Sequence, residues 1–384
     1  MVPAAGESVM IVTGEASGDL HGARVAAGIL SRAQGIHMFG IGGDRLKATG
    51  VELIIHSDTL SVMGISEVLG RLAAIRSGLA TARRLLREKR PDLVILIDFP
   101  DFNLRVAAEA KRLKIPVLYY ISPKIWAWRQ KRVRKIRKLT DHMAVILPFE
   151  KSFYDQYAVP STFVGNPVLD IPAYRNPEVF QKHASGHFTV GLLPGSREME
   201  MKRHLPVLLD SAKLLHHRRD STRFVLSLIP ALRKAPYLEM IEAARWEVPL
   251  EVTSAPVEAV FRRCHALVAA SGTVTLEAAV CGCPMVVIYK VSRLSYWVGK
   301  AMIRVPFISL VNLIAGGEVV PELIQERAEP AGIVRELLRL ADHPDQLEDM
   351  RSKLLKVRHK LGNPGASDRV AKIALGMIEA RIGR

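Results

Sequence analysis

The sequence has few aromatic residues and no long uninterrupted apolar run. Only 6% of its 384 residues are Phe, Trp or Tyr. The two most apolar stretches are interrupted by charged residues or proline, at Glu277 and Pro284 in one and at Lys300, Arg304 and Pro306 in the other. About 18 successive apolar residues, the minimum for a membrane-spanning helix, therefore never occur. The start, MVPAAGESVMIVTG, has no basic segment before its short apolar run, which is typical of a first strand rather than of a signal peptide. A cytosolic protein that spans no membrane is expected.

Cysteine is scarce as well. The three cysteines, Cys264, Cys281 and Cys283, are too few and too close together for a disulfide framework. The C-G-C spacing lacks the two-residue spacer of zinc and thioredoxin-type motifs. Ordinary buried thiols in a reducing compartment are expected.

Two common nucleotide-binding fingerprints are also missing. GIGGDR (residues 40–45) places Arg45 where a dinucleotide GxGxxG motif needs its last glycine, which argues against a dehydrogenase. GLLPGSR (191–197) lacks the Gly-Lys-Ser/Thr ending of a Walker A loop.

Positive charge, in contrast, is abundant. There are 54 Lys and Arg residues against 38 Asp and Glu, a net charge of +16. This excess favours nucleic acid, anionic lipid or phosphorylated substrates as partners, without choosing among them. Part of it lies in WAWRQKRVRKIRKL (126–139), where Val133 and Ile136 have helical spacing. The segment is consistent with a solvated amphipathic helix, with RNA binding or with an anionic membrane surface, although no RRM, KH or zinc signature accompanies it.

Short apolar runs rich in Val and Ile alternate with longer helical patterns. The runs lie at residues 9–13, 93–97, 116–121, 143–147, 188–193, 223–229, 266–270 and 285–289. Strands separated by single helices predict right-handed βαβ units and mostly parallel sheets covered on both faces. A segment dense in Pro, Asn and Gly interrupts the pattern at 165–187. The prediction is an α/β protein of two Rossmann-like domains, 1–167 and 168–359, that face each other across a cleft.

The first predicted strand ends in GEASGDLHG (14–22). Gly14 and Gly18 permit tight backbone turns, while Ser17 and Asp19 can cap the helix that follows. The amides at that helix start favour an anion, so a simple cap and an anion site both remain open.

Two loops in the second half suit a nucleoside diphosphate. In GLLPGSR, the amides of Gly195 and Ser196 and the forked guanidinium of Arg197 can cradle phosphates, although such a turn alone is a weak signal. In ALVAASGTVTLE, a strand ends at Ser271, Gly272 and Thr273, and the next helix carries Glu277 in an apolar setting. Val274 stands three residues before Glu277, so a capping box does not explain the acid. A phosphate-binding helix start followed by an acid for ribose hydroxyls is favoured over a purely structural helix.

Two further segments have both structural and functional interpretations. ISLVNLIAGGEVVPELIQ (308–325) places Asn312 and Glu318 around a Gly-Gly pair, either in a plain strand, turn and helix or in a loop that positions a sugar or diphosphate. LSVMGISEVLGRLAAI (60–75) has apolar residues on more than one helical face, which suits core packing or a membrane-facing patch. The apolar residues of the second segment are Val62, Met63, Ile65, Val68, Leu69 and Leu72.

Two acids follow the buried run in DLVILIDFPDFNLR (92–105). Asp98 ends the strand at the expected mouth of the cleft, where a catalytic base could act. Asp101 follows Pro100 and is predicted to cap a helix that begins near Asn103.

Seven motifs in order resemble the lipid-A-disaccharide synthase family. They are GEASGD (14–19), IDFPDFN (97–103), SPKIWAWR (122–129), LPFE (147–150), LLPGSR (192–197), ASGTVTLE (270–277) and NLIAGGEVVPELIQ (312–325). The resemblance implies an inverting GT-B glycosyltransferase that transfers 2,3-diacylglucosamine from UDP to the 6-hydroxyl of 2,3-diacylglucosamine 1-phosphate. The products would be the β-1,6-linked disaccharide 1-phosphate and UDP.

The resemblance also implies residue roles. Asp98 would be the general base, Glu15, Ser17 and Asp19 would seat the acceptor in the first domain, and the second domain would bind the UDP-sugar. The donor residues would be Gly195, Ser196, Arg197, Ser271, Gly272, Thr273, Glu277, Asn312 and Glu318. Asn166 and Gly317 depart from the family pattern and leave the donor contacts near them open.

The family works without a metal or other cofactor, peripherally on the cytoplasmic face of the inner membrane of Gram-negative bacteria. By the same resemblance, the 60–75 patch and the basic segment would dock on that anionic surface, and no nucleic acid is expected as a partner. The C-terminal helix (360–384) would pack back on the first domain or swap in a homodimer. A related UDP-sugar glycosyltransferase, a UDP-sugar 2-epimerase and, from a different class, an RNA-binding protein are the alternatives.

Overall fold

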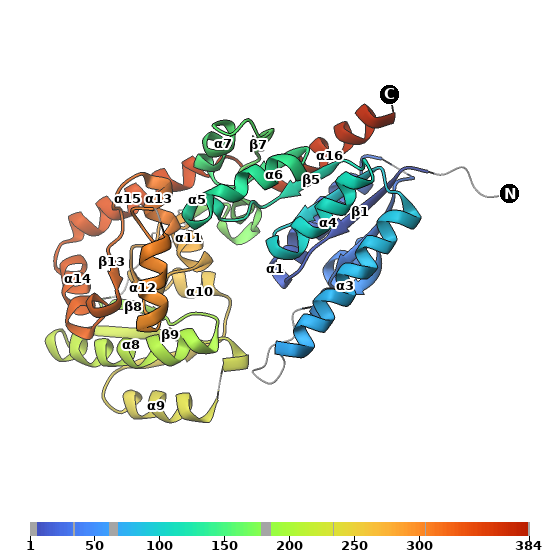
Figure 1. Ribbon diagram of the computed structural model, residues 1–384. Helices are drawn as coiled ribbons and strands as arrows, with labels where there is room; N and C mark the ends of the chain where they lie inside the picture. The colour runs from blue at the N-terminus through green and yellow to red at the C-terminus, as the bar shows by residue number, and fades with distance from the viewer. Residues whose placement is uncertain are drawn as a thin grey trace. The chain divides into compact units, whose positions relative to one another are not determined.

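The computed structural model in Figure 1 describes residues 6–33, 35–60, 68–177, 186–232, 234–303 and 305–382. The chain forms two compact units. Unit 1 contains residues 1–167 and 362–384, and unit 2 contains residues 168–361. Each unit is an α/β sandwich around its own parallel sheet. Within the described residues, none of the helices combines the length and the apolar character needed to cross a bilayer.

Sheet A of unit 1 has seven strands in the order β3-β2-β1-β4-β5-β6-β7, all parallel. The strands are β1 (Ser8–Val12), β2 (His37–Gly42), β3 (Glu52–His56), β4 (Leu93–Ile97), β5 (Val117–Tyr120), β6 (His142–Val145) and β7 (Ser161–Phe163). Every residue of the central strand β4 is buried, as expected for a parallel strand covered on both faces.

Helices cover both faces of sheet A. They are α1 (Ala16–Leu30), α2 (Asp44–Lys47), α3 (Val68–Lys89), α4 (Pro100–Arg112), α5 (Ile125–Trp128), α6 (Val133–Leu139), α7 (Pro148–Asp155) and α16 (Ala366–Ile382). One core includes Val133 and Ile136 of α6 together with β4 and β5 side chains. The other core packs α1 and α16 on the opposite face.

The last helix returns to the first unit. Gly28 of α1 lies against Ala371 of α16 so closely that a Cβ atom at Gly28 would be 3.0 Å from that of Ala371. Arg369 donates to the carbonyl of Val164 over 2.8 Å, and Arg381 donates to the carbonyls of Pro91 and Asp92. Helix α16 is therefore an integral layer of unit 1.

Sheet B of unit 2 has six parallel strands in the order β10-β9-β8-β11-β12-β13. The strands are β8 (Phe188–Leu193), β9 (Thr222–Ser227), β10 (Leu250–Thr253), β11 (Ala266–Ala270), β12 (Met285–Tyr289) and β13 (Glu322–Ile324). The helices are α8 (Glu198–Arg218), α9 (Ala235–Arg245), α10 (Val257–Phe261), α11 (Thr273–Val280), α12 (Arg293–Met302), α13 (Leu310–Ala315), α14 (Pro330–Asp342) and α15 (Pro344–Lys360). The eight apolar runs noted in the sequence all contain strands.

Candidate active site

In unit 1, two predicted loops lie side by side at the carboxyl edge of sheet A. Strands β1 and β4 are parallel neighbours, and Val12 is in register with Leu96. Gly14 lies two residues after Val12, and Asp98 lies two residues after Leu96. The GEASGD and IDFPDFN segments therefore leave the sheet side by side. Glu15 and Ser17 are exposed there, and Asp98 is partly buried.

The backbone at Asp98 adopts a strained turn. Asp98 and Phe99 both have φ of 47°, the left-handed region that non-glycine residues rarely enter. The carbonyl of Asp98 accepts hydrogen bonds from the Asn103 amide at 2.7 Å and the Tyr119 hydroxyl at 2.6 Å. Such strain persists only where the surroundings fix it, and it is often found at functional sites.

Gly14 makes room for this turn. A Cβ atom at position 14 would stand 2.2 Å from Cγ of Phe99. The Phe99 ring stacks on Phe102 with centroids 5.2 Å apart. The glycine of the first loop therefore allows Phe99 to pack and so helps to hold the backbone of Asp98.

The electrostatic surroundings raise the pKa of Asp98. Burial is the main cause and the negative charge of Glu15 adds to it, while a Phe99 backbone hydrogen bond and the positive charge of Lys124 act in the opposite direction. A carboxylate with an elevated pKa is a better proton acceptor than an ordinary aspartate, provided that it is still ionised. This environment suits a general base.

Asp19 is buried and bonded to the loop that follows β2. Its side chain is 5% exposed, and its carboxylate accepts hydrogen bonds from the amides of Gly43 (2.6 Å), Arg45 (3.1 Å) and Leu46 (3.2 Å). Asp19 thus fixes the GIGGDR loop and the start of α2. That Asp19 also seats the acceptor stays a prediction.

Side-chain capping, one of the interpretations for the first helix and the prediction for Asp101, is not found at either helix start. Helix α1 begins at Ala16 with Glu15 at its N-cap, and no side chain caps it, so Ser17 and Asp19 lie within its first turn. Helix α4 begins at Pro100 and its N-cap is Phe99. Asp101 is therefore inside the helix, and it pairs with Arg132 at 2.9 Å.

The basic segment forms a charged surface over an apolar layer. Val133 and Ile136 are fully buried, whereas Lys124, Lys131, Arg134, Lys135, Arg137 and Lys138 are exposed. Trp126 donates to Glu150 over 3.1 Å, which joins SPKIWAWR to LPFE. Burial raises the pKa of Glu150 to about 7. The two motifs therefore contribute to the core, and the cations remain available to solvent.

Much of the apolar patch predicted at 60–75 lies outside the described residues. Val62, Met63 and Ile65 lie outside the described residues. Val68, Leu69 and Leu72 lie on α3, for which the description at these positions is limited to the backbone.

In unit 2, two predicted loops again follow neighbouring strands at the carboxyl edge of the sheet. Strands β8 and β11 are parallel neighbours with Leu193 in register with Ala269. Gly195 lies two residues after Leu193, and Ser271 lies two residues after Ala269. The PGSR and SGT loops therefore leave sheet B side by side at its carboxyl edge. Ser196, Arg197, Gly272 and Thr273 are exposed. The structure brings together the loops expected to bind a diphosphate.

A carboxylate of the chain already contacts the first of these loops. Glu200 Oε2 accepts hydrogen bonds from the amides of Ser196 (2.9 Å) and Arg197 (3.2 Å). Gly195 has φ of +114°, and a Cβ atom there would be 2.4 Å from that oxygen. The sequence reasoning missed Glu200, although its position three residues after the N-cap Arg197 is the spacing of a capping box.

The second loop begins a helix that carries a buried acid. Thr275 Oγ1 donates to the carbonyl of the N-cap residue Gly272 over 2.7 Å. One turn further, Glu277 accepts a hydrogen bond of 2.6 Å from the Tyr174 hydroxyl. Burial raises the pKa of Glu277, and the Tyr174 hydrogen bond partly offsets that effect. No local sequence signal identified Tyr174 as the partner of Glu277.

Asn312 and Glu318 are not positioned with these loops. Asn312 is fully buried; its amide donates to Val320 O and Glu322 Oε1, and its oxygen accepts from the amides of Val319 and Val320. Glu318 is exposed and precedes β13, so it lies at the amino edge of sheet B, opposite the ends of β8 and β11. In this structure Asn312 fixes the turn before β13, and the donor contacts of the two residues stay a prediction.

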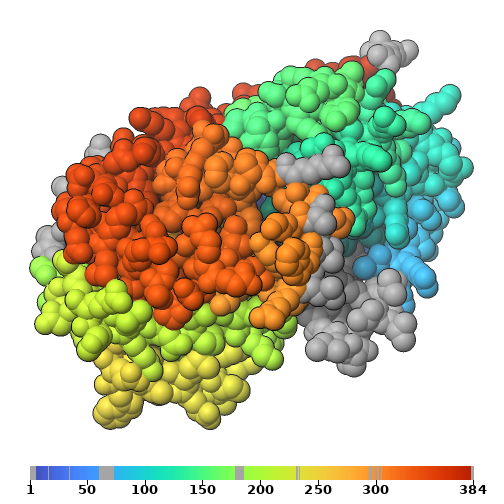
Figure 2. All heavy atoms as spheres, turned by 60° about the vertical axis from the view of Figure 1, so that its left-hand side comes forward, coloured from blue at the N-terminus to red at the C-terminus, as the bar shows by residue number. Residues whose placement is uncertain are grey.

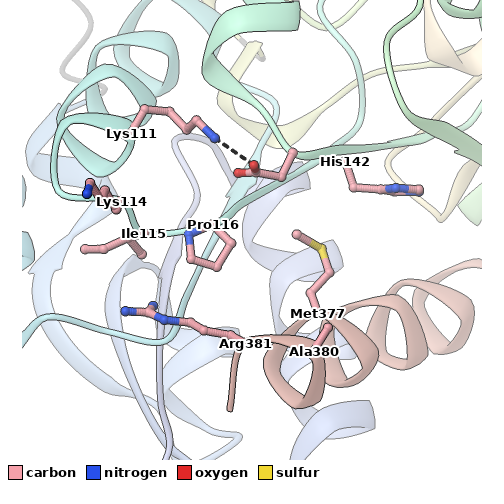
Figure 3. Close-up of a pocket in the computed structure, with 9 residues that line it drawn as sticks. Lys111, Lys114, Ile115, Pro116, His142, Met377, Ala380 and Arg381 are labelled. Atoms are coloured by element: carbon pink, nitrogen blue, oxygen red, sulfur yellow. Dashed lines mark hydrogen bonds and ion pairs between the residues drawn. The ribbon is translucent and has the colours of Figure 1, made fainter. Parts of the chain in front are cut away.

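Two cavities lined by described residues lie away from these loops. One of about 490 Å³ lies at the amino edge of sheet A, between the end of α4, the starts of β5 and β6 and the end of α16 (Figure 3). Lys111 points across it and bonds to Asp141 at 2.6 Å. Another of about 490 Å³ in unit 2 includes Glu318 in its lining. Among the residues that the structure describes, no cluster of three or more His, Cys, Asp or Glu side chains could hold a metal ion.

Comparison with known proteins identifies the family. The model for a family described as lipid-A-disaccharide synthetase matches residues 9–375. The lipid-A-disaccharide synthase of Geobacter metallireducens is 46% identical over 385 residues, which cover 98% of this chain and 99% of that protein. The chain belongs to the lipid-A-disaccharide synthase family. It is accordingly a glycosyltransferase, a hexosyltransferase of lipid A biosynthesis.

Solved structures support the fold of this family member. A putative UDP-N-acetylglucosamine 2-epimerase from Listeria monocytogenes aligns with a TM-score of 0.62 and 12% identity over 99% of this chain and 97% of its own. The glycosyltransferase of kitacinnamycin aligns with a TM-score of 0.62 and 16% identity over 98% of this chain and all (100%) of its own. At such low identity these likenesses concern the fold alone. The two parallel sheets and the neighbours confirm the predicted GT-B class.

Proposed function

We propose that this lipid-A-disaccharide synthase family member transfers 2,3-diacylglucosamine from its UDP donor to the 6-hydroxyl of 2,3-diacylglucosamine 1-phosphate. The products are the β-1,6-linked disaccharide 1-phosphate and UDP. The observation that carries the mechanism is Asp98, a partly buried carboxylate with an elevated pKa on a strained turn at the carboxyl edge of sheet A.

In the proposed reaction, the acceptor oxygen attacks the anomeric carbon of the donor. The bond between that oxygen and the anomeric carbon forms, and the bond from the anomeric carbon to the diphosphate breaks with inversion. Asp98 takes the hydroxyl proton, and UDP leaves with the bonding electron pair. A positioned base typically contributes about 10²- to 10⁴-fold, so positioning and charge stabilisation must supply the remainder.

The departing UDP would be held in unit 2. Arg197 is exposed and can approach the diphosphate, as can the backbone around Gly195 and Ser196 once the Glu200 carboxylate moves. The exposed residues Gly272 and Thr273 begin α11, where a helix start favours negative charge. Ser271 precedes them, and its amide is bonded to the carbonyl of Ile288. Glu277, fixed by Tyr174, would accept the ribose hydroxyls.

The acceptor and its acyl chains would be handled in unit 1. Glu15 and Ser17 are exposed beside Asp98 and would seat the acceptor. We propose that the exposed cations of 124–138 and the apolar residues of 60–75 dock the enzyme on the anionic cytoplasmic face of the inner membrane. High salt together with Val68→Ser and Leu69→Ser should then weaken binding to liposomes, and unchanged binding would refute this docking.

The decisive experiment is incubation with UDP-diacylglucosamine and diacylglucosamine 1-phosphate, followed by mass spectrometry of the lipid product. Disaccharide 1-phosphate should form, and Asp98→Asn should reduce its rate by at least 10²-fold. If the parent enzyme makes no disaccharide, the assignment fails. If Asp98→Asn retains full activity, Asp98 is not the base.

A UDP-sugar 2-epimerase is the alternative that the fold also accommodates. Because an epimerase needs no acceptor, UDP release that is independent of the acylated acceptor would support it. Acceptor-dependent release supports the transferase. Tight, structure-selective RNA gel shifts at physiological salt would be needed to favour the RNA-binding alternative.

A further inference from the structure

Helix α12 of unit 2 presents a basic and aromatic stripe to solvent. Arg293, Trp297 and Lys300 occupy positions i, i+4 and i+7, which lie on one face of a helix. Trp297 is 65% exposed, and Arg293 and Lys300 are exposed beside it. The orange segment around residue 300 lies at the surface in Figure 2. A large aromatic between two cations is typical of a helix that lies in a membrane interface.

The sequence around the stripe contains no acid. Between Glu277 and Glu318 the sequence has no Asp or Glu, but it has Lys290, Arg293, Lys300 and Arg304. Met302 (39% exposed) and Ile303 (43% exposed) extend the apolar surface at the end of the helix. Lys300 Nζ lies 5.5 Å from the centre of the Trp297 ring, so charge and aromatic surface are presented together.

Charge distinguishes α12 from the other exposed apolar helix of the unit. Helix α9 and the residue after it expose Leu238, Met240 and Trp246, of which Trp246 is 90% exposed. Exposure alone would therefore select α9 as a docking surface. However, Glu239, Glu242 and Glu247 accompany that surface. Glu242 is paired with Arg245 and Glu247 with Lys213, so the surface has no excess of positive charge to attract an anionic membrane. The complementary charge is at α12.

We infer that unit 2 has its own membrane contact, in which α12 inserts Trp297 at the lipid headgroup level while Arg293 and Lys300 bind anionic headgroups. The occupant is an anionic bilayer surface. This contact deepens the proposed function, because a donor with acyl chains must reach unit 2 from the bilayer. It gives unit 2 a lipid contact that does not depend on the basic segment of unit 1.

Tryptophan fluorescence can test this contact directly. A protein with Trp128→Phe and Trp246→Phe retains Trp297 and Trp126, and Trp126 is buried. Vesicles of brominated phosphatidylcholine with phosphatidylglycerol should quench its emission, and vesicles without phosphatidylglycerol should quench it less. Adding Trp297→Phe should remove the quenching. If the protein floats with the vesicles but Trp297 is not quenched, or if it binds no vesicle, the inference is overturned.

Charge and aromatic variants provide the matched controls. Arg293→Gln together with Lys300→Gln should weaken vesicle partitioning about 25-fold, since each basic residue near an anionic surface contributes about fivefold. Trp297→Ser should weaken it as well, whereas Trp246→Ser should leave it unchanged. Equal effects of the two tryptophan variants would contradict the role of α12. So would a change of solution mass in Trp297→Ser, because it would indicate that a second copy covers the stripe.

An activity assay separates this inference from the proposed function. With donor and acceptor dispersed in detergent, Trp297→Ser should form disaccharide at the parental rate. Failure of the parent in that assay refutes the transferase assignment, whatever the vesicle data show. Normal detergent activity with unchanged vesicle binding in Trp297→Ser refutes only the α12 contact.

Discussion

The hydroxyl of Tyr174 donates a 2.6 Å hydrogen bond to Oε2 of Glu277. Tyr174 lies in a short 3₁₀ turn, Pro172–Tyr174, soon after the chain enters unit 2. Arg358 binds the carbonyl of Tyr174 at 2.7 Å and that of Val280, at the end of α11, at 2.9 Å. The segment at the unit boundary is therefore bonded to the helix that carries the proposed ribose ligand.

Tyr174→Phe should weaken donor binding. Without the hydroxyl, the partly buried Glu277 loses an oriented partner and the pKa of its carboxyl rises further. Loss of one hydrogen bond to a charged group, at about 1–3 kcal/mol, predicts a KM for the UDP donor about 5- to 100-fold higher with kcat changed little. Tyr237→Phe is the control, because its hydroxyl makes only a 3.5 Å contact with Glu198 O. An unchanged donor KM in Tyr174→Phe would exclude this positioning role.

The pH dependence of activity should respond in opposite directions to two neighbours of Asp98. The negative charge of Glu15 raises the pKa of Asp98 and the positive charge of Lys124 lowers it. A base acts when ionised, so activity falls as the pH decreases through its pKa. Glu15→Gln should move the acidic limb of kcat/KM to lower pH, and Lys124→Gln should move it to higher pH. Shifts of the same sign in both variants would show that the limb belongs to another group.

Gly14→Ala should disrupt the turn that holds the proposed base. Its methyl group would overlap the ring of Phe99, which stabilises the left-handed backbone of residues 98 and 99. We expect a loss of about 1–3 kcal/mol in the free energy of unfolding and at least tenfold in kcat. Gly18→Ala is the matched control, since its methyl group would be an ordinary 3.6 Å from Thr13 within a helix. Urea unfolding and initial rates measure both effects, and equal behaviour of the two variants would refute the explanation.

Glu200→Gln should increase the affinity for UDP. The carboxylate of Glu200 occupies the Ser196 and Arg197 amides and competes there with a diphosphate. Removing its charge should tighten UDP binding about fivefold in calorimetry, while weakening the helix cap by about 1 kcal/mol. Glu198→Gln, in the same helical turn but paired with Lys234 at 2.7 Å, should leave UDP affinity unchanged. Weaker UDP binding in Glu200→Gln would indicate that the carboxylate organises the loop for the donor.

Much of the fold could be predicted because it depends on local patterns. The buried run LVILI could only be a strand in a sheet covered on both faces, and it forms β4. Alternation of such runs with helices predicts parallel sheets, and parallel sheets place loops at a common carboxyl edge. The strand order of each sheet then brings Gly14 beside Asp98 and Gly195 beside Ser271.

The sequence by itself determined the family, the two parallel sheets and the loops that bear the candidate site. The tertiary structure decided what each polar side chain in those loops contacts. Asp19 meets the amides of residues 43–46, Asp101 meets Arg132 and Glu277 meets Tyr174, all distant in sequence. A residue's type shows that it can accept a hydrogen bond, but the burial and the donor are fixed only when remote segments pack together. For that reason Asp98, just after β4, and Asp19, in the first turn of α1, have different surroundings although their motifs leave the sheet side by side.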